Sequence, residues 1–283
     1  MSTAFDPMSA ADQSRFRSAY LAYLHARDGT PDLDAQRFDI RERFFAGVDA
    51  QPQCWCGRPP VDQRVFDRNH ERRVPERGLD ERTLWALATA KTNRAERFGV
   101  DFEIAHNGKP PDAANDPHAY IMIEELYHTR ILRDALATIG LTVEIGRPTA
   151  VTRAMVNAMV RLPSQMSDVF VLCGEIVGVA IFTLLLEKAR VLFADQPAVL
   201  ARIETLFAQI MVDEVGHVHF VRSRLGPVRL AVAKRVLPVV VWGVMRDIPE
   251  LALLCGRDRL MQTAARGEVD TAAAGYADRF VFA

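Results

Sequence analysis

Two Glu-x-x-His motifs are the residues of this sequence that could carry out chemistry. Glu125 and His128 form the first motif, and Glu214 and His217 form the second. A carboxylate and an imidazole three residues apart lie on one face of a helix, close enough to bind one metal ion. Each motif is preceded by a further acid and lies within a long predicted helix. The pair therefore predicts a two-metal carboxylate site.

A four-helix site of this type needs one more carboxylate on each of two other helices, and Glu175 is the first candidate. Between residues 169 and 186 every residue is apolar or glycine except Glu175 and Thr183. An unpaired charge there is costly, so Glu175 is expected to be paired, protonated or bound to metal. The alternative is a neutral acid buried in a helix contact. The position of Glu175 along its helix supports the ligand role. Glu175 lies about 20 residues before the turn at 195–196 and Glu214 about 18 after it, so two antiparallel helices would place them at nearly the same height.

The same comparison of distances from a turn selects Glu96, on the helix expected to pair with the helix of the first motif. Glu96 lies about 15 residues before the turn near residue 111, and Glu125 about 14 after it. Glu81 and Glu103 would lie at other heights along the helix. Arginines at positions 94 and 97 leave a surface ion pair as the alternative for Glu96.

The predicted ligands are four carboxylates and two imidazoles, with no cysteine. This donor set favours iron or manganese over a structural zinc site. Two iron ions are the expected occupants, with manganese or a mixed Mn/Fe pair as alternatives. Four carboxylate charges offset two divalent ions, so the buried centre would be neutral. The set is Glu96, Glu125, His128, Glu175, Glu214 and His217.

The elements that must position these residues are helices, and the predicted fold class is all-α. Capping residues, prolines and glycines place four long helices at residues 80–107, 117–140, 164–193 and 197–225. Shorter helices are expected at 9–26, 34–45 and 149–161. Further helix is expected at 228–263, with breaks at Pro238 and Pro249. No segment shows the alternation of a strand.

The chain divides into three predicted regions. Residues 1–79 form a helical N-terminal extension that ends in an arginine- and proline-rich connector, residues 80–227 form the four-helix unit with the metal site, and residues 228–283 form a C-terminal helical cover. The charged part of the connector, residues 58–82, is either a solvated segment, a lid, or a clamp for an anionic substrate or a reductase.

Composition limits the function classes. The 283 residues are 49% apolar and 25% charged with a net charge of −1, which gives no basic footprint for nucleic acid. Cys54 and Cys56 are spaced too tightly for the usual Cys-x-x-Cys zinc or redox loop. No disulfide framework is expected, which favours a reducing, cytoplasmic location.

No signal peptide or transmembrane segment is predicted. The N-terminus lacks a basic region followed by an apolar run. The apolar run at 169–186 contains Glu175, which is costly at bilayer depth. The run at 236–245 is too short to cross a membrane and contains Pro238, although contact with a membrane surface is left open.

The ligand pattern resembles the ferritin-like di-iron carboxylate proteins over about residues 80–225. That superfamily includes ribonucleotide reductase small subunits, bacterial multicomponent monooxygenases, stand-alone N-oxygenases and fatty-aldehyde oxygenases. The resemblance implies a ferritin-like four-helix bundle in which each Glu-x-x-His motif supplies one half-site. It also implies that Asp213 and Glu124 each orient the histidine of the opposite motif. The arylamine N-oxygenases carry a third histidine where this chain has Ile210, so the chain departs from that subgroup.

The resemblance implies a di-iron monooxygenase or oxidase that uses O2 and acts on a small, apolar or aromatic substrate. A reductase or ferredoxin would donate electrons, and a homodimer is among the expected assemblies because exposed helix faces in this class often pair. The alternative is a ferritin-like iron-oxidising, storage or structural metal-binding protein without an organic substrate. Tyr127 lies two residues after Glu125 and should point away from the ligands.

Overall fold

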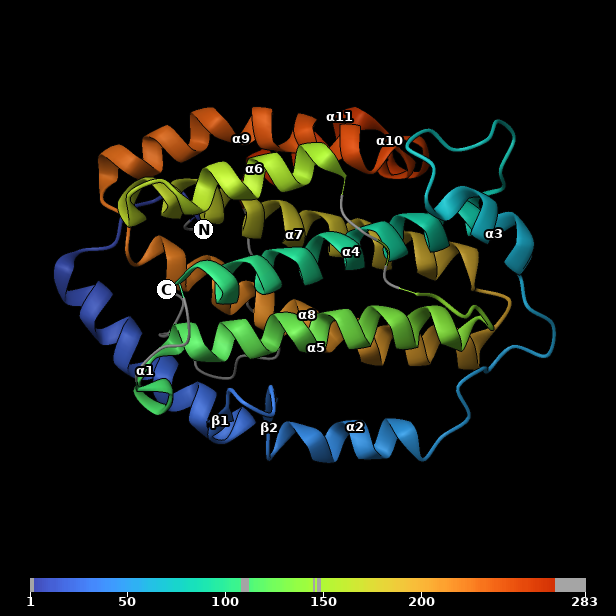
Figure 1. Ribbon diagram of the computed structural model, residues 1–283, viewed down its shortest axis with the longest axis horizontal. Helices are drawn as coiled ribbons and strands as arrows, with labels where there is room; N and C mark the ends of the chain where they lie inside the picture. Colours follow the sequence, from blue (N-terminus) through green and yellow to red (C-terminus); the bar gives the residue numbers. More distant parts are fainter. Residues whose placement is uncertain (1–2, 108–111, 145, 147–148, 268–283) are drawn as a thin grey trace.

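Four long helices form the centre of the molecule. The computed structural model describes residues 3–107, 112–144, 146 and 149–267. The central helices lie side by side (Figure 1), with α4 paired with α5 and α7 paired with α8. α5 also packs closely on α8, whereas α4 and α7 make fewer contacts. The four are α4 (Glu81–Asn107), α5 (Pro117–Thr138), α7 (Ser164–Leu192) and α8 (Pro197–Arg222). The predicted all-α class is therefore confirmed.

Local sequence signals account for the ends of these helices. The Thr83 N–H donates to Oδ1 of Asp80, at 2.9 Å, and so caps α4. Asp116 caps α5 in the same way by accepting from the His118 N–H at 3.0 Å, and proline follows at the first helical position. Each cap contributes about 1 kcal/mol to helix stability. Beyond α5, Gly140 has a φ of 82°, a conformation that glycine adopts without strain.

The N-terminal segment differs from the prediction. It contains α1 (Ala10–Asp28), then a hairpin of two short strands, β1 (Pro31–Asp32) and β2 (Arg37–Phe38). Two further helices follow, α2 (Arg41–Asp49) and α3 (Gln63–His70). The predicted helix at 34–45 begins only at residue 41. The Asp32 side chain accepts from the N–H groups of residues 34 and 35, and Gln36 has a φ of 52°. Both features stabilise a turn at the expense of helix.

The remaining helices surround the central four. They are η1 (Ala113–Asn115), α6 (Ala150–Val160), α9 (Pro227–Asp247), α10 (Pro249–Cys255) and α11 (Arg257–Arg266). The break predicted at Pro249 is confirmed, but the one predicted at Pro238 is wrong, because α9 continues through it. Pro238 and Lys234 are both exposed, so water can hydrate the Lys234 carbonyl that loses its helical partner.

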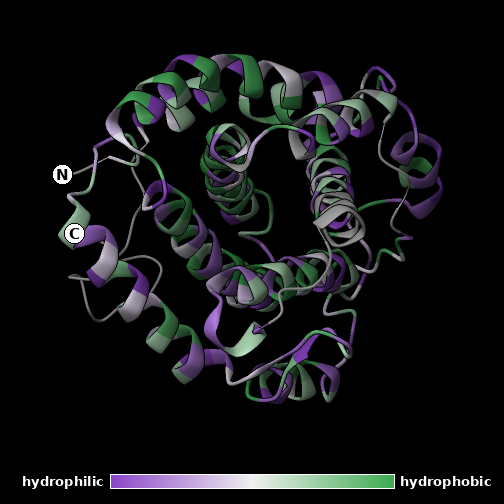
Figure 2. Cartoon of the chain, turned by 60° about the vertical axis from the view of Figure 1, so that its left-hand side comes forward, coloured by the Kyte–Doolittle hydropathy of each residue, from purple (hydrophilic) through white to green (hydrophobic). Residues whose placement is uncertain are grey.

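The core lies between the central helices and extends under the peripheral ones. The turned view of Figure 2 shows the peripheral helices packed around the central ones. Trp85 is wholly buried, and its Nε1 donates to the Leu185 carbonyl at 2.9 Å, which joins α4 to α7. Its ring packs against Phe193 and Phe207.

α7 is long and apolar enough to cross a membrane by length and composition alone. In this fold 67% of its most apolar window is buried within the molecule. The helix packs against α8 on one side and α9 on another. Burial in a protein core therefore accounts for its apolar sequence.

Candidate metal centre

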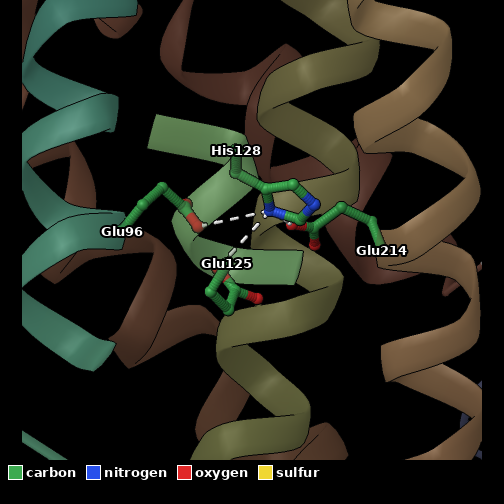
Figure 3. A group of neighbouring side chains, drawn as sticks. All are labelled: Glu96, Glu125, His128 and Glu214. Carbon is green, nitrogen blue, oxygen red and sulfur yellow. Dashed lines mark ion pairs between the residues drawn. The ribbon is translucent and has the colours of Figure 1, made fainter. Parts of the chain in front are cut away.

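All six predicted ligands face one another between the four central helices. Their ligand atoms form two groups, and within each group the atoms lie within 4.8 Å of one another. Figure 3 shows the first group, with Glu96 projecting from α4 and Glu214 from α8 toward the pair on α5. Glu125 and Glu214 belong to both groups, so the two half-sites share two carboxylates. The groups are Glu96, Glu125, His128 and Glu214, and Glu125, Glu175, Glu214 and His217.

A glycine of α7 makes room for one shared carboxylate. A Cβ atom built on Gly178 would lie 2.8 Å from Oε2 of Glu214, closer than van der Waals contact allows. A Cβ on Gly174 would meet nothing within 4 Å. Of the two glycines that flank Glu175, only Gly178 is therefore required by the site.

Both motif histidines turn Nδ1 toward the carboxylates. Nδ1 of His128 lies 3.4 Å from Glu125 and 3.3 Å from Glu214. Nδ1 of His217 lies 3.0 Å from Glu125 and 3.5 Å from Glu175. Both nitrogens are buried, and neither makes a well-aligned hydrogen bond within the described residues. Because a buried polar atom needs a partner, metal ions between these nitrogens and the carboxylates would satisfy both.

The other nitrogen of each imidazole contacts an acid from the opposite motif. Nε2 of His128, on α5, lies 3.1 Å from Asp213 of α8. Nε2 of His217, on α8, lies 2.9 Å from Glu124 of α5. Each acid is fully buried. This crossed arrangement orients each ring so that its Nδ1 faces the ligand carboxylates.

Two arginines from the N-terminal segment neutralise these outer acids. Arg27 of α1 and Arg41 of α2 both form ion pairs with Asp213. Their guanidinium groups also lie 3.6 Å and 3.7 Å from Glu124. Asp28 completes the cluster at 3.7 Å from Arg41. Sequence reasoning missed both arginines, because no spacing links them to the motifs.

The contacts of Asp213 set the pKa of its carboxyl group. Burial alone would raise the pKa of the Asp213 carboxyl, but Arg27, Arg41 and His128 together lower it well below its ordinary value. Asp213 is therefore ionised and can accept a hydrogen bond from the His128 imidazole.

Among the ligand carboxylates, the pKa is raised for Glu96, Glu175 and Glu214, whereas the two histidines lower the pKa of Glu125 well below its ordinary value. Burial raises the pKa of Glu96, and the Glu125 carboxylate raises it further, well above its ordinary value. Burial also raises the pKa of Glu214 to about 7, with contributions from Glu175 and Glu125. Carboxylates gathered in so small a volume repel one another, and divalent cations at their shared face would relieve that repulsion.

The ligands are unevenly buried. The side chains of Glu96, Glu125 and Glu175 are 17%, 15% and 15% exposed, whereas Glu214 is 2% exposed and the two histidines are fully buried. Glu96 lies on α4 and Glu175 on α7, the two central helices that contact each other less. α6 packs against both of these helices, as Figure 1 shows. The part of the centre formed by Glu96, Glu125 and Glu175 is therefore less completely buried than the part formed by the histidines and Glu214.

Two other features are separate from the centre. A surface hollow of about 390 Å³ lies between α1, the start of α5 and the end of α8, and none of the six ligands lines it. Tyr127 points away from the ligands, as predicted, since its hydroxyl donates to Glu42 at 2.5 Å and accepts from the Phe38 N–H at 3.0 Å.

Comparisons of the chain with protein-family models, with curated proteins and with solved structures gave no match. The functional assignment therefore depends on the residues and their geometry.

Proposed function

We propose that the chain is a ferritin-like di-iron oxidoreductase that activates O2 and oxidises a small, apolar or aromatic substrate. The observation that carries the proposal is the pair of half-sites sharing Glu125 and Glu214, each completed by one histidine and one further carboxylate. Nitrogen and oxygen donors without sulfur suit iron and manganese. Two reduced iron ions, when bound, supply the electrons and the open positions that O2 chemistry requires.

The protein's own residues would keep this centre assembled and dry. Glu124 and Asp213 would hold the imidazoles in one tautomer, and Arg27 and Arg41 keep Asp213 ionised. The arginines come from α1 and α2, so the N-terminal segment closes the imidazole side of the centre. O2 and substrate would then approach from the side of the partly exposed Glu96, Glu125 and Glu175.

The residues of α7 around Glu175 favour an apolar substrate. Between residues 169 and 186, α7 carries no charged side chain other than Glu175. Gly174, next to Glu175, is exposed, and Val171 is half-buried. A charged molecule would find no counter-charge on this wall, whereas a hydrocarbon or aromatic ring would bury apolar surface there.

Metal analysis tests the centre directly. The purified chain should contain about two iron ions per molecule, as two half-sites require. Glu175→Ala and His217→Ala should each lose one or both ions, because each removes a ligand of one half-site. Glu204→Ala is the matched control, since Glu204 is an exposed acid of α8 that pairs with Arg190. Full iron content in both ligand variants would refute the assignment.

Oxygen consumption then separates the enzyme from the alternative. Protein reduced without air should consume O2 on mixing, and a screen of small aromatic and aliphatic compounds should yield an oxidised product. A reductase or ferredoxin would sustain turnover. If O2 uptake instead loaded many iron ions per chain and no organic compound was oxidised, a ferritin-like iron oxidiser would be the better description.

A further inference from the structure

α9 carries two apolar faces, and only one of them is used by the fold. The inner face, Leu230, Ala233, Leu237 and Val241, is buried against the rest of the molecule. On the outer face Val228, Val232, Val239 and Trp242 are 78%, 39%, 65% and 57% exposed. Their spacing of four, seven and three residues places these four side chains along one side of the helix, here called the outer stripe. α9 lies at the periphery of the molecule (Figure 1).

Basic residues surround the outer stripe. α9 contains Arg229, Lys234, Arg235 and Arg246, while the whole chain has a net charge of −1. The only acid of the helix, Asp247, accepts hydrogen bonds from Thr149 at 2.5 Å and Thr152 at 2.7 Å. The helix therefore presents apolar side chains bordered by positive charge.

We propose that α9 docks the protein on a bilayer that contains anionic lipids. A basic amphipathic helix lies in the plane of the interface, with its apolar side chains among the upper acyl chains and its cations beside the phosphates. Trp242 suits that boundary, because the indole combines an apolar ring with a polar N–H group. Arg246, whose guanidinium lies 5.3 Å from the Trp242 ring, would reach the phosphates from the same position.

The charge distribution favours a lipid surface over a second copy of the chain. Arg235 lies on the same side of the helix as the outer stripe, midway between Val228 and Trp242. A two-fold symmetric pairing of two outer stripes would place Arg235 opposite the same residue of the other copy, and like charges in a contact are unfavourable. An anionic bilayer instead complements Arg235 and Arg246, the two cations on the side of the outer stripe.

Vesicle binding tests the proposal with the full chain. The protein should co-sediment with vesicles of equal parts phosphatidylcholine and phosphatidylglycerol, and less with phosphatidylcholine alone. Val239→Ser combined with Trp242→Ser should reduce the bound fraction about tenfold, because two inserting side chains are lost. Val191→Ser is the matched control, since Val191 is 71% exposed on α7 outside the outer stripe, and it should bind as the unaltered chain does.

Fluorescence gives a second measurement. In a Trp55→Phe background, the emission of Trp242 should shift to the blue on vesicle binding and be quenched by brominated lipid, while Trp85 is wholly buried and constant. Failure to bind anionic vesicles would overturn the proposal. So would equal losses in the Val191→Ser control, or a dimer in solution that depends on Trp242. Binding that needs Arg235 but neither Val239 nor Trp242 would show adsorption by charge alone and would also overturn it.

Discussion

Replacement of Arg41 by methionine tests whether the N-terminal segment is part of the metal centre. Arg41 is 2% exposed and forms an ion pair with the fully buried Asp213. It also lies 3.7 Å from Glu124. Arg41→Met keeps most of the side-chain volume but removes the charge, so the buried Asp213 carboxylate loses one of its two arginine partners. Breaking a buried pair in this way costs about 3–5 kcal/mol, and the lower value is expected because Arg27 still contacts Asp213.

Metal affinity should fall together with stability. With less positive charge beside it, Asp213 orients the His128 imidazole less well, and loss of such outer contacts lowers metal affinity by about 10–100-fold. Urea unfolding of metal-free protein measures the stability term. Iron retention against a graded series of chelators measures the affinity term.

A surface pair provides the control. Arg190 and Glu204 lie 2.7 Å apart, but the two side chains are 55% and 39% exposed. Arg190→Met should cost less than about 1 kcal/mol and leave iron retention unchanged. Adding Asp213→Asn to Arg41→Met should recover part of the stability, because the unpaired charge is removed. If Arg41→Met were no more harmful than Arg190→Met, the inference that buried charges compensate one another at this site would be refuted.

Two further predictions concern the centre and its surroundings. Gly178→Ala should displace the Glu214 carboxylate and lower iron affinity about tenfold. The methyl group added by Gly174→Ala would meet open space, so iron affinity should not change. Both substitutions raise helix propensity, so this effect does not distinguish them. Equal iron retention in the two variants would contradict the packing argument. Burial, together with the Glu124 carboxylate, raises the pKa of Asp28 to about 8, so between pH of about 4 and 8 the folded state keeps a proton that the unfolded state releases. The free energy of unfolding should therefore fall as pH rises through this window, by at most about 1.4 kcal/mol per pH unit from this residue, and Asp28→Asn should remove that slope. Urea unfolding midpoints measured across this pH range check the sign of the pH dependence. If the stability difference between Asp28→Asn and the parent protein did not change with pH, the prediction would be wrong.

Helix positions and the inner ligands could be predicted from the sequence because both are local properties. A residue and its neighbour three positions on share a helix face whatever surrounds them, so the alignment of Glu125 with His128 follows from the helical repeat. The caps at Asp80 and Asp116 depend on side chains within three residues. Glu175 stood out because residues 169–186 contain no other charged residue.

The hairpin at 31–38 and the unbroken α9 needed the structure. Turn formation by Asp32 competes with helix propensity, and the composition of the segment does not show which prevails. Pro238 is tolerated in α9 because its side of the helix faces solvent, and a sequence does not show which side that is.

The sequence by itself determined the four long helices and the six candidate ligands, including the register that sets Glu96 against Glu125 and Glu175 against Glu214. Only the tertiary structure brought Arg27 and Arg41 to Asp213 across 186 and 172 residues of chain. Contacts at that separation leave no periodic trace in a sequence, because they depend on how α1 and α2 pack against α5 and α8. The tertiary structure likewise decided which face of α9 stayed exposed. Burial of the inner face against α7 leaves the outer stripe and its cations on the surface.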